Sequence, residues 1–293
     1  MHVPVLLLET IALLDPKQGE FFIDGTLGGG GHSKIILDKI GKTGKLLVVD
    51  LDKKATDQFK EETAAENVII ANDNFAKLPE ILKKHKLRRA DGLILDLGFS
   101  SDQIELSGRG FSFLRDEPLL MTYSDENEPL YQLLTRMKQE EIEAVIRDYG
   151  DERYAGRIAR EIREKIRRRE IIRSSKELAD LIKRAVPANY EHGRIHPATR
   201  TFQAFRIYAN KEVENLESVL ANIGKIVTKG GRVAVISFHS LEDRIVKNYF
   251  RNYAKEQKVE ILTDKPVTAS IAEVSQNPRS RSAKLRAVKI LKS

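Results

Sequence analysis

The sequence predicts an α/β protein with a Rossmann-like, doubly wound sheet and a block of helices inserted into it. Three observations lead to this prediction. Over the first hundred residues, short apolar runs alternate with amphipathic helical patterns. A strand, a glycine-rich turn and a helix follow one another between Phe21 and Ile40, as at the ligand-binding corner of such sheets. Strand patterns then stop after about residue 104 and return only near the C-terminal end.

The first 104 residues contain four apolar runs short enough for buried strands, with helical patterns before and between them. Glycines or other turn residues separate the runs from the helices. The expected strands are 21–23, 45–50, 68–71 and 92–97, and the expected helices are 6–14, 32–40, 55–65 and 78–85.

Residues 105–196 lack this alternation. An irregular loop at 105–125 is followed by helical periodicity alone, which predicts helices at 130–137, 140–149, 153–168 and 174–186. Helices inside an α/β domain indicate an insertion. The predicted domains are therefore a discontinuous domain of residues 1–104 and 197–293, and an inserted helical domain of residues 105–196.

The α/β pattern resumes after the insertion. A long helix is expected over 199–226, followed by a strand at 233–237 and a helix at 245–253. Two alternating segments, 259–263 and 285–291, are expected to be the final strands.

The composition excludes several kinds of chemistry. With no cysteine among 293 residues, the chain cannot form a disulfide, a thiolate zinc site or a cysteine-ligated iron–sulfur cluster. A cysteine nucleophile for carbon-5 methylation of pyrimidines is also excluded. No apolar run approaches a membrane span of about 20 residues, and Met1 to Asp15 lacks the features of a secretory signal. We therefore expect a cytoplasmic protein, and its net charge of +7 favours a polyanionic partner.

The glycine-rich turn predicts the ligand by its spacing. A dinucleotide fingerprint would need a glycine at Ser33, and a P-loop would need a lysine at Gly31. The next apolar run ends in Asp50, about 20 residues after the glycines, where a carboxylate can accept hydrogen bonds from ribose hydroxyls. A ribose-binding acid beside a loop without a phosphate motif favours a site for S-adenosylmethionine. The alternative is a tight turn with a structural role only.

Other polar groups follow the apolar runs. Asp96 lies inside the fourth run, and since an unpartnered buried carboxylate is costly, we expect it to face a ligand or strong donors. Phe75 follows the third run and is predicted either to pack beside an adenine or to belong to the core. His239 and Asp243 follow the fifth run, but the spacing of a hydrolase nucleophile is missing there.

Metal binding is not expected. His192 and His196 stand four residues apart, but Gly193 and Pro197 favour a loop, and no nearby acid completes a site.

Arginines gather on one predicted helix, at 153–168. Tyr154, Ile158, Ile162 and Ile166 share one face, and most other positions are basic. The excess of arginine favours a surface for an RNA backbone over a merely solvated face.

Taken together, six motifs resemble the bacterial RsmH (MraW) family along almost the whole chain. They are GTLGGGGHS, DLGFSS, RGFSF, HPATRTFQAFRI, SFHSLEDRIVK and NPRSRSAKLR. The resemblance implies a class I S-adenosylmethionine-dependent methyltransferase with an inserted helical substrate-recognition domain. It also implies methylation of the exocyclic N4 of a cytidine in the decoding region of small-subunit (16S) ribosomal RNA. The implied partner is that RNA or the assembled small subunit, with the protein a monomer or a homodimer.

The resemblance also implies a set of cofactor-binding residues. They are Gly30, Gly31, His32, Asp50, Phe75, Asp96 and Gln103. For catalysis we expect Asp96 to accept a hydrogen bond from the target amine and His239 or Asp243 to receive its proton. The flipped base would stack on Phe99 or Phe111.

One loop departs from the family pattern. Leu120 and Thr122 stand where the family has an acid and an arginine. Two alternatives therefore stay open: an RNA-binding assembly factor that retains the cofactor site, and a methyltransferase acting on DNA or protein.

Overall fold

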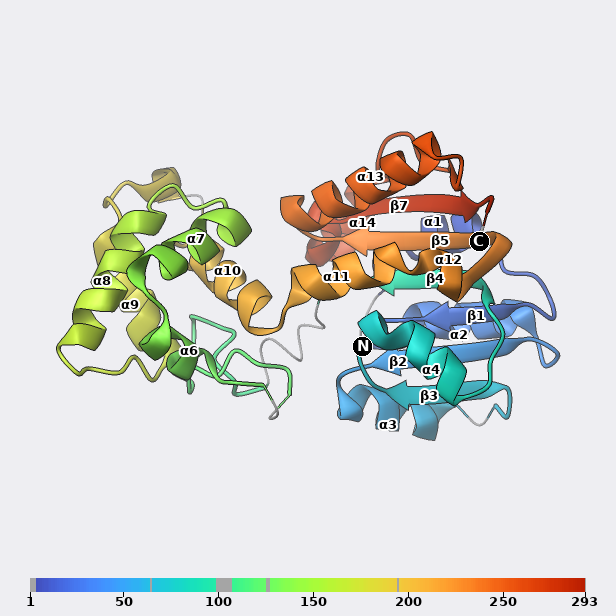
Figure 1. Cartoon of the computed structure of the whole chain (residues 1–293), viewed down its shortest axis with the longest axis horizontal. Helices are drawn as coiled ribbons and strands as arrows, with labels where there is room; N and C mark the ends of the chain where they lie inside the picture. The colour runs from blue at the N-terminus through green and yellow to red at the C-terminus, as the bar shows by residue number, and fades with distance from the viewer. Residues whose placement is uncertain (1–3, 64, 99–106, 125–126, 194, 293) are drawn as a thin grey trace. The chain divides into compact units, whose positions relative to one another are not determined.

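A computed structural model describes residues 4–63, 65–98, 107–124, 127–193 and 195–292 of the chain. These residues form two compact units (Figure 1). Unit 1 comprises Met1–Ser100 and Glu214–Ser293, and unit 2 comprises Ser101–Val213.

Unit 1 contains a seven-stranded sheet in the order β3-β2-β1-β4-β5-β7-β6. The strands are β1 (Phe21–Asp24), β2 (Lys45–Asp50), β3 (Val68–Asn72), β4 (Ala90–Asp96), β5 (Val227–Ser237), β6 (Val259–Ile261) and β7 (Lys284–Ile290). Strands β1 to β5 pair in parallel, whereas β7 runs antiparallel to both β5 and β6. The order reverses between β1 and β4, which is the switch point where doubly wound sheets bind ligands. The predicted doubly wound fold is confirmed.

Helices cover both faces of this sheet (Figure 1). They are α1 (Leu7–Leu14), α2 (Gly31–Ile40), α3 (Lys53–Glu62), α4 (Leu78–Lys84), α11 (Glu212–Ala221), α12 (Ile223–Ile226), α13 (Ser240–Lys255) and α14 (Ile271–Gln276). Alternate strand residues enter opposite cores: Phe21 and Ile23 pack in one hydrophobic cluster, and Phe22 packs in the other. Strands buried on both faces explain why the sequence shows continuous apolar runs there.

Unit 2 is helical, as predicted for the insertion. Its helices are α6 (Leu130–Arg136), α7 (Gln139–Gly150), α8 (Ala155–Arg167), α9 (Ser175–Ala185) and α10 (Thr199–Ala209). The Ser174 hydroxyl accepts a hydrogen bond from the N–H of Glu177 and so begins α9, as its sequence pattern predicts. The apolar faces of these helices form one core of their own.

The end of unit 2 differs from the predicted insertion boundary at residue 196. Helix α10 belongs to unit 2 because Phe202, Ala204 and Phe205 are buried in the same cluster as the faces of α6 to α9. The single long helix expected over 199–226 is also divided. Lys211 has a positive φ of 52°, which ends the first segment and lets α11 begin at Glu212.

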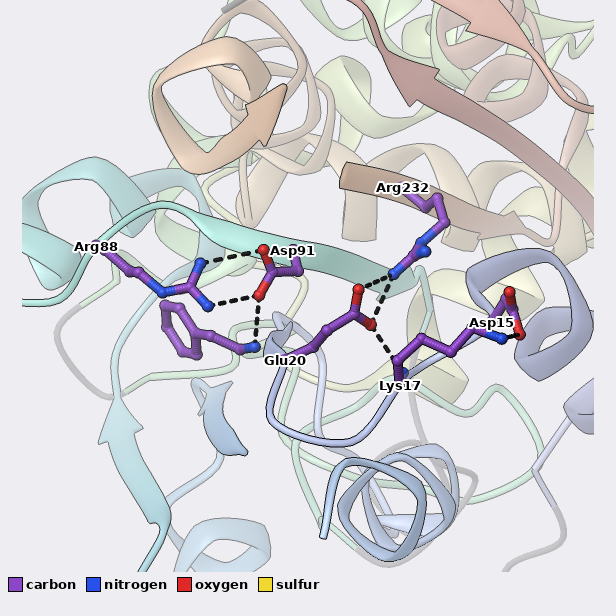
Figure 2. Close-up of polar contacts among 7 residues, drawn as sticks. Asp15, Lys17, Glu20, Arg88, Asp91 and Arg232 are labelled. Carbon is purple, nitrogen blue, oxygen red and sulfur yellow. Dashed lines mark hydrogen bonds and ion pairs between the residues drawn. The ribbon is translucent and has the colours of Figure 1, made fainter. Parts of the chain in front are cut away.

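Polar contacts fasten the amino-terminal edge of the sheet (Figure 2). One Arg232 nitrogen donates to both carboxylate oxygens of Glu20, at 2.8 Å each. Asp91 accepts from the N–H of Phe21 at 2.8 Å and also pairs with Arg88. These contacts connect the starts of β1 and β4 with Arg232 of β5. They lie at the edge opposite the carboxyl ends of the parallel strands.

None of the helices in the described ranges is long and apolar enough to cross a membrane.

Gly92 should be intolerant of a side chain. It lies opposite Phe22 in the β1–β4 register, and a Cβ at this position would overlap the Phe22 ring. Because this core is close-packed, we expect Gly92→Ala to lower the free energy of unfolding by about 1–3 kcal/mol in urea denaturation. Combining it with Phe22→Leu should give a loss smaller than the sum of the two single losses. Additive losses would contradict this explanation.

Candidate functional site

Acidic side chains meet at the carboxyl edge of the sheet. Strands β1, β2 and β4 end in Asp24, Asp50 and Asp96, and β5 ends in Ser237. Because these strands are parallel and adjacent in the order β2-β1-β4-β5, their last residues lie side by side. The sheet therefore gathers three carboxyl groups that are far apart in sequence.

The turn after β1 is bonded to both neighbouring strands. The N–H of Gly28 donates to Asp50 Oδ2 at 2.8 Å, and the N–H of Leu27 donates to the carbonyl of Val49 at 3.1 Å. On the other side, the N–H of Asp96 donates to the Thr26 hydroxyl at 2.6 Å. The turn is thus held in one position relative to the ends of β2 and β4.

Asp50 retains capacity for a ligand. Its two oxygens accept from the N–H groups of Gly28 and Asp52, each at 2.8 Å. A carboxylate has about four lone-pair sites, so two remain for hydroxyl donors. Burial raises the pKa of Asp50, while the two N–H groups oppose that rise.

The predicted residues Gly30, Gly31 and His32 begin helix α2, and packing explains both glycines. Gly30 has a φ of 71°, and a Cβ there would come 2.6 Å from the ring of Phe59. A Cβ on Gly31 would come 2.7 Å from Pro4. A side chain at either position would overlap a neighbour, so packing alone requires both glycines. This requirement holds whether or not the glycines contact a ligand.

Asp24 is a site residue that the sequence analysis did not select. It is 2% exposed, and its carboxyl accepts from the Ser33 hydroxyl at 2.7 Å and the Thr26 N–H at 3.1 Å. Burial raises its pKa to about 6, although these two hydrogen bonds lower it. An acid ending a buried strand was the signal that singled out Asp50, and the same signal was present here.

Asp96 is the most perturbed acid of the group. Its Oδ1 is buried and has no hydrogen-bond partner among the residues that the structure describes, and its Oδ2 lies 3.8 Å from His32 Nδ1. Burial, and then the negative charges of Asp24 and Glu242, raise the pKa of Asp96 well above its usual range. A buried acceptor of this kind suits a ligand that brings a donor or a positive charge.

His239 and Asp243 lie after β5, as the sequence predicts, but the two residues have different partners. His239 precedes α13, and its Nε2 lies 3.2 Å from Glu242 Oε1. Asp243 accepts from Arg286 Nε at 2.6 Å and from Lys284 Nζ at 3.3 Å. Burial alone would raise the pKa of Asp243, but the contacts with Arg286 and Lys284 lower it on balance. This carboxylate is a poor proton acceptor, so the expected catalytic role of Asp243 is not carried further.

The remaining predicted residues are aromatic or polar. Phe75 is half-buried after β3 and packs against the core that contains Ile23 and Leu95. Phe111 is 8% exposed and stacks on Tyr123 in unit 2, so the expected stacking of Phe111 on a flipped base is not supported. Gln103 and Phe99 lie outside the described residues.

The residues present fit S-adenosylmethionine. Asp50 keeps acceptor sites for ribose hydroxyls, the loop after β1 carries no phosphate motif, and Asp96 Oδ1 is a buried acceptor. The acids that surround Asp96 favour a cationic ligand, and S-adenosylmethionine carries a sulfonium. The fold and this site define a class I S-adenosylmethionine-dependent methyltransferase.

Comparisons with known proteins give the family. The chain belongs to the MraW methylase family, whose model matches residues 1–291. It is 41% identical to the ribosomal RNA small subunit methyltransferase H of Syntrophotalea carbinolica, with 99% of this chain and 98% of that protein covered. The protein of the same name from Geotalea daltonii is 44% identical, with 98% and 97% covered. That from Clostridium botulinum strain 657 is 41% identical, with 97% of each chain covered.

Removing the Asp50 carboxylate should weaken cofactor binding. We expect Asp50→Ala to lower the affinity for S-adenosylmethionine about 10- to 100-fold in calorimetry, because hydrogen bonds to a charged acceptor contribute about 1.5–3 kcal/mol. Asp57→Ala, at an exposed position on α3, is the matched control and should bind normally. Equal affinities of the two variants would remove Asp50 from the site.

Asp24 should make the fold less stable as the pH rises. Its pKa is about 6 when folded and 3.8 ordinarily, so the folded chain holds a proton that the unfolded chain releases between these values. The free energy of unfolding should therefore fall by about 2 kcal/mol more in wild type than in Asp24→Asn between about pH 4 and pH 6. Urea denaturation of both proteins across this range tests this, and parallel pH profiles would contradict it.

Proposed function

We propose that this methyltransferase transfers a methyl group to the exocyclic N4 of a cytidine in the decoding region of small-subunit ribosomal RNA. The class of substrate follows from relatives that share over 40% of their residues with this chain and bear the name of a ribosomal RNA small subunit methyltransferase. Asp96 carries the proposal for the reaction, because an amine donor would satisfy its buried Oδ1.

The target amine needs assistance. Its lone pair is delocalised into the cytosine ring, so it is a weak nucleophile. When bound, S-adenosylmethionine supplies an activated methyl group and a good leaving group. In the transfer, the amine nitrogen would bond to the methyl carbon as the carbon–sulfur bond breaks with its electrons moving to sulfur, and the nitrogen would then lose one proton.

Asp96 is proposed to act on that amine. A cationic ligand nearby favours the ionised carboxylate, which counteracts the rise in pKa caused by burial, Asp24 and Glu242. The ionised Asp96 accepts a hydrogen bond from the amine, increases its nucleophilicity and holds the proton as it departs. His32 Nδ1 lies 3.8 Å from Asp96 Oδ2, which is too far for a hydrogen bond. His239 is the second candidate for receiving the proton.

Unit 2 is proposed to recognise the substrate, with small-subunit ribosomal RNA or the assembled small subunit as the partner and the cytoplasm as the place of action. One of the two residues that differ from the family loop, Thr122, has a structural role. Thr122 is 1% exposed, and its hydroxyl and carbonyl both accept hydrogen bonds from Arg109. Thr122 therefore supports the loop that contains Arg109 and Gly110, and this favours a tolerated substitution over a lost substrate contact.

The reaction is tested with small subunits from a strain that lacks this modification. After incubation with the protein and S-adenosylmethionine, the RNA is digested and its nucleosides are compared by mass spectrometry with an N4-methylcytidine standard. We expect N4-methylcytidine to form. If the protein binds cofactor but no such nucleoside appears, the proposed reaction is wrong, and a binding-only assembly factor or another substrate takes its place.

The role of Asp96 is tested in the same assay. We expect Asp96→Asn to lower turnover about 100-fold or more, because general acid–base assistance contributes about that much. Asp38→Asn, at an exposed position on α2, is the control and should keep full turnover. Full turnover of Asp96→Asn would overturn this role without affecting the identity of the product.

A further inference from the structure

The positive charge of this protein is concentrated in one segment of unit 2. Residues 153–184 contain twelve Lys and Arg against five Asp and Glu. Their net charge of +7 equals the formal net charge of the whole chain, so the other residues sum to zero. The high pI therefore reflects one local surface and not a general excess of basic residues.

Helices α8 and α9 present this charge to solvent. The inner face of α8 buries Ala155, Ile158, Ala159 and Ile162 in the core of unit 2. Its arginines are mostly exposed: Arg153, Arg157, Arg160, Arg167 and Arg168. Their spacing places them along one stripe of the helix, about 20 Å long at 1.5 Å per residue. Exposed Lys176, Lys183 and Arg184 follow on α9. We call this set the arginine face.

Few acids neutralise the arginine face. Arg160 lies 3.8 Å from Glu164, and Lys165 pairs with Glu170 and Glu177. Among the residues that the structure describes, no acidic group forms an ion pair with Arg157, Arg167 or Arg168. Like charges three or four residues apart destabilise a helix, so this arrangement is unfavourable without an anionic partner. A merely solvated face would gain from more acids at these positions.

Tyr154 orders part of the arginine face in advance. The guanidinium carbons of Arg153 and Arg157 lie 4.9 Å and 5.6 Å from the centre of its ring. The centre of the Tyr154 ring lies 6.0 Å from the centre of the Tyr190 ring. Two arginines held in this way lose less side-chain entropy when they bind an anion.

We propose that the arginine face binds the sugar–phosphate backbone of the RNA substrate, at a surface separate from the residues that act on the base. This inference rests on the proposed RNA substrate. Guanidinium groups match phosphate oxygens in geometry, and a stripe of this length can contact several successive phosphates. Such contacts carry no sequence information, so the arginine face would supply affinity and position while the base is selected elsewhere.

The test compares two triple variants with the same change in charge. The first carries Arg157→Gln, Arg160→Gln and Arg167→Gln on the arginine face. The control carries Lys83→Gln, Lys84→Gln and Arg251→Gln, all at exposed positions in unit 1. Binding of deproteinised small-subunit rRNA is measured without S-adenosylmethionine over about 50–200 mM salt. Melting temperature and cofactor affinity are measured to show that each variant is folded.

We expect the arginine-face variant to bind rRNA at least about 10-fold more weakly at low salt. The slope of log affinity against log salt concentration is negative, and its magnitude should decrease by about 2 in this variant. Each phosphate contact contributes about 0.7–0.9 to that magnitude. The control should match wild type. Equal affinity and slope for the two variants would overturn the inference, as would wild-type binding that does not depend on salt.

The outcome is separable from that of the methylation assay because RNA binding is measured without the methyl donor. A changed salt slope with no N4-methylcytidine formed by wild type would leave the arginine face standing and refute the proposed reaction. An unchanged slope with normal N4-methylcytidine formation would refute the role of the arginine face and support the proposed reaction.

Discussion

The hydrogen bonds that join the turn after β1 to β2 and β4 hold two acids of the site, Asp50 and Asp96, beside one turn. Gly28 donates to Asp50, and Asp96 donates through its N–H to Thr26. Both bonds depend on parallel pairing, which brings the carboxyl ends of three strands to one edge. Since the same turn leads into α2, it also carries His32 to within 3.8 Å of the Asp96 carboxyl. A shift of this turn would therefore move the carboxyl groups of both Asp50 and Asp96 relative to it.

Bringing three acids together has an electrostatic consequence. Asp24 and Asp96 are both desolvated. The negative charge of Asp24 raises the pKa of Asp96, to which Glu242 adds, and the negative charge of Asp50 raises the pKa of Asp24. Without a ligand, these surroundings shift the carboxyl groups toward the protonated form relative to water. A cation in the site reverses this preference, so binding of a sulfonium and ionisation of Asp96 favour each other. Under the proposed mechanism, cofactor binding would therefore favour the ionised form of Asp96 that accepts a hydrogen bond from the amine.

The sequence predicted the doubly wound sheet and selected Asp50 and Asp96, because acids that end buried apolar runs are visible in local pattern. It missed what depends on pairing between distant segments. Asp243 looked available until β7 brought Arg286 against it, at 2.6 Å. Phe111 was expected to stack on a flipped base, yet it stacks on Tyr123 inside unit 2. The break at Lys211 was hidden because a single left-handed residue leaves no mark on helical periodicity.

The two charge environments of the chain suit different parts of a nucleotide. Carboxyl groups with raised pKa values tolerate a neutral base that donates hydrogen bonds, but a phosphate among them would meet repulsion from Asp50 and from Asp96 once it ionises. Phosphates instead have a favourable partner in residues 153–184, which carry the entire net charge. An enzyme that acts on a base must separate that base from its helical stack while keeping hold of the strand. The proposed strand binding by arginines in unit 2 and base binding by acids in unit 1 would meet those two demands with different residues.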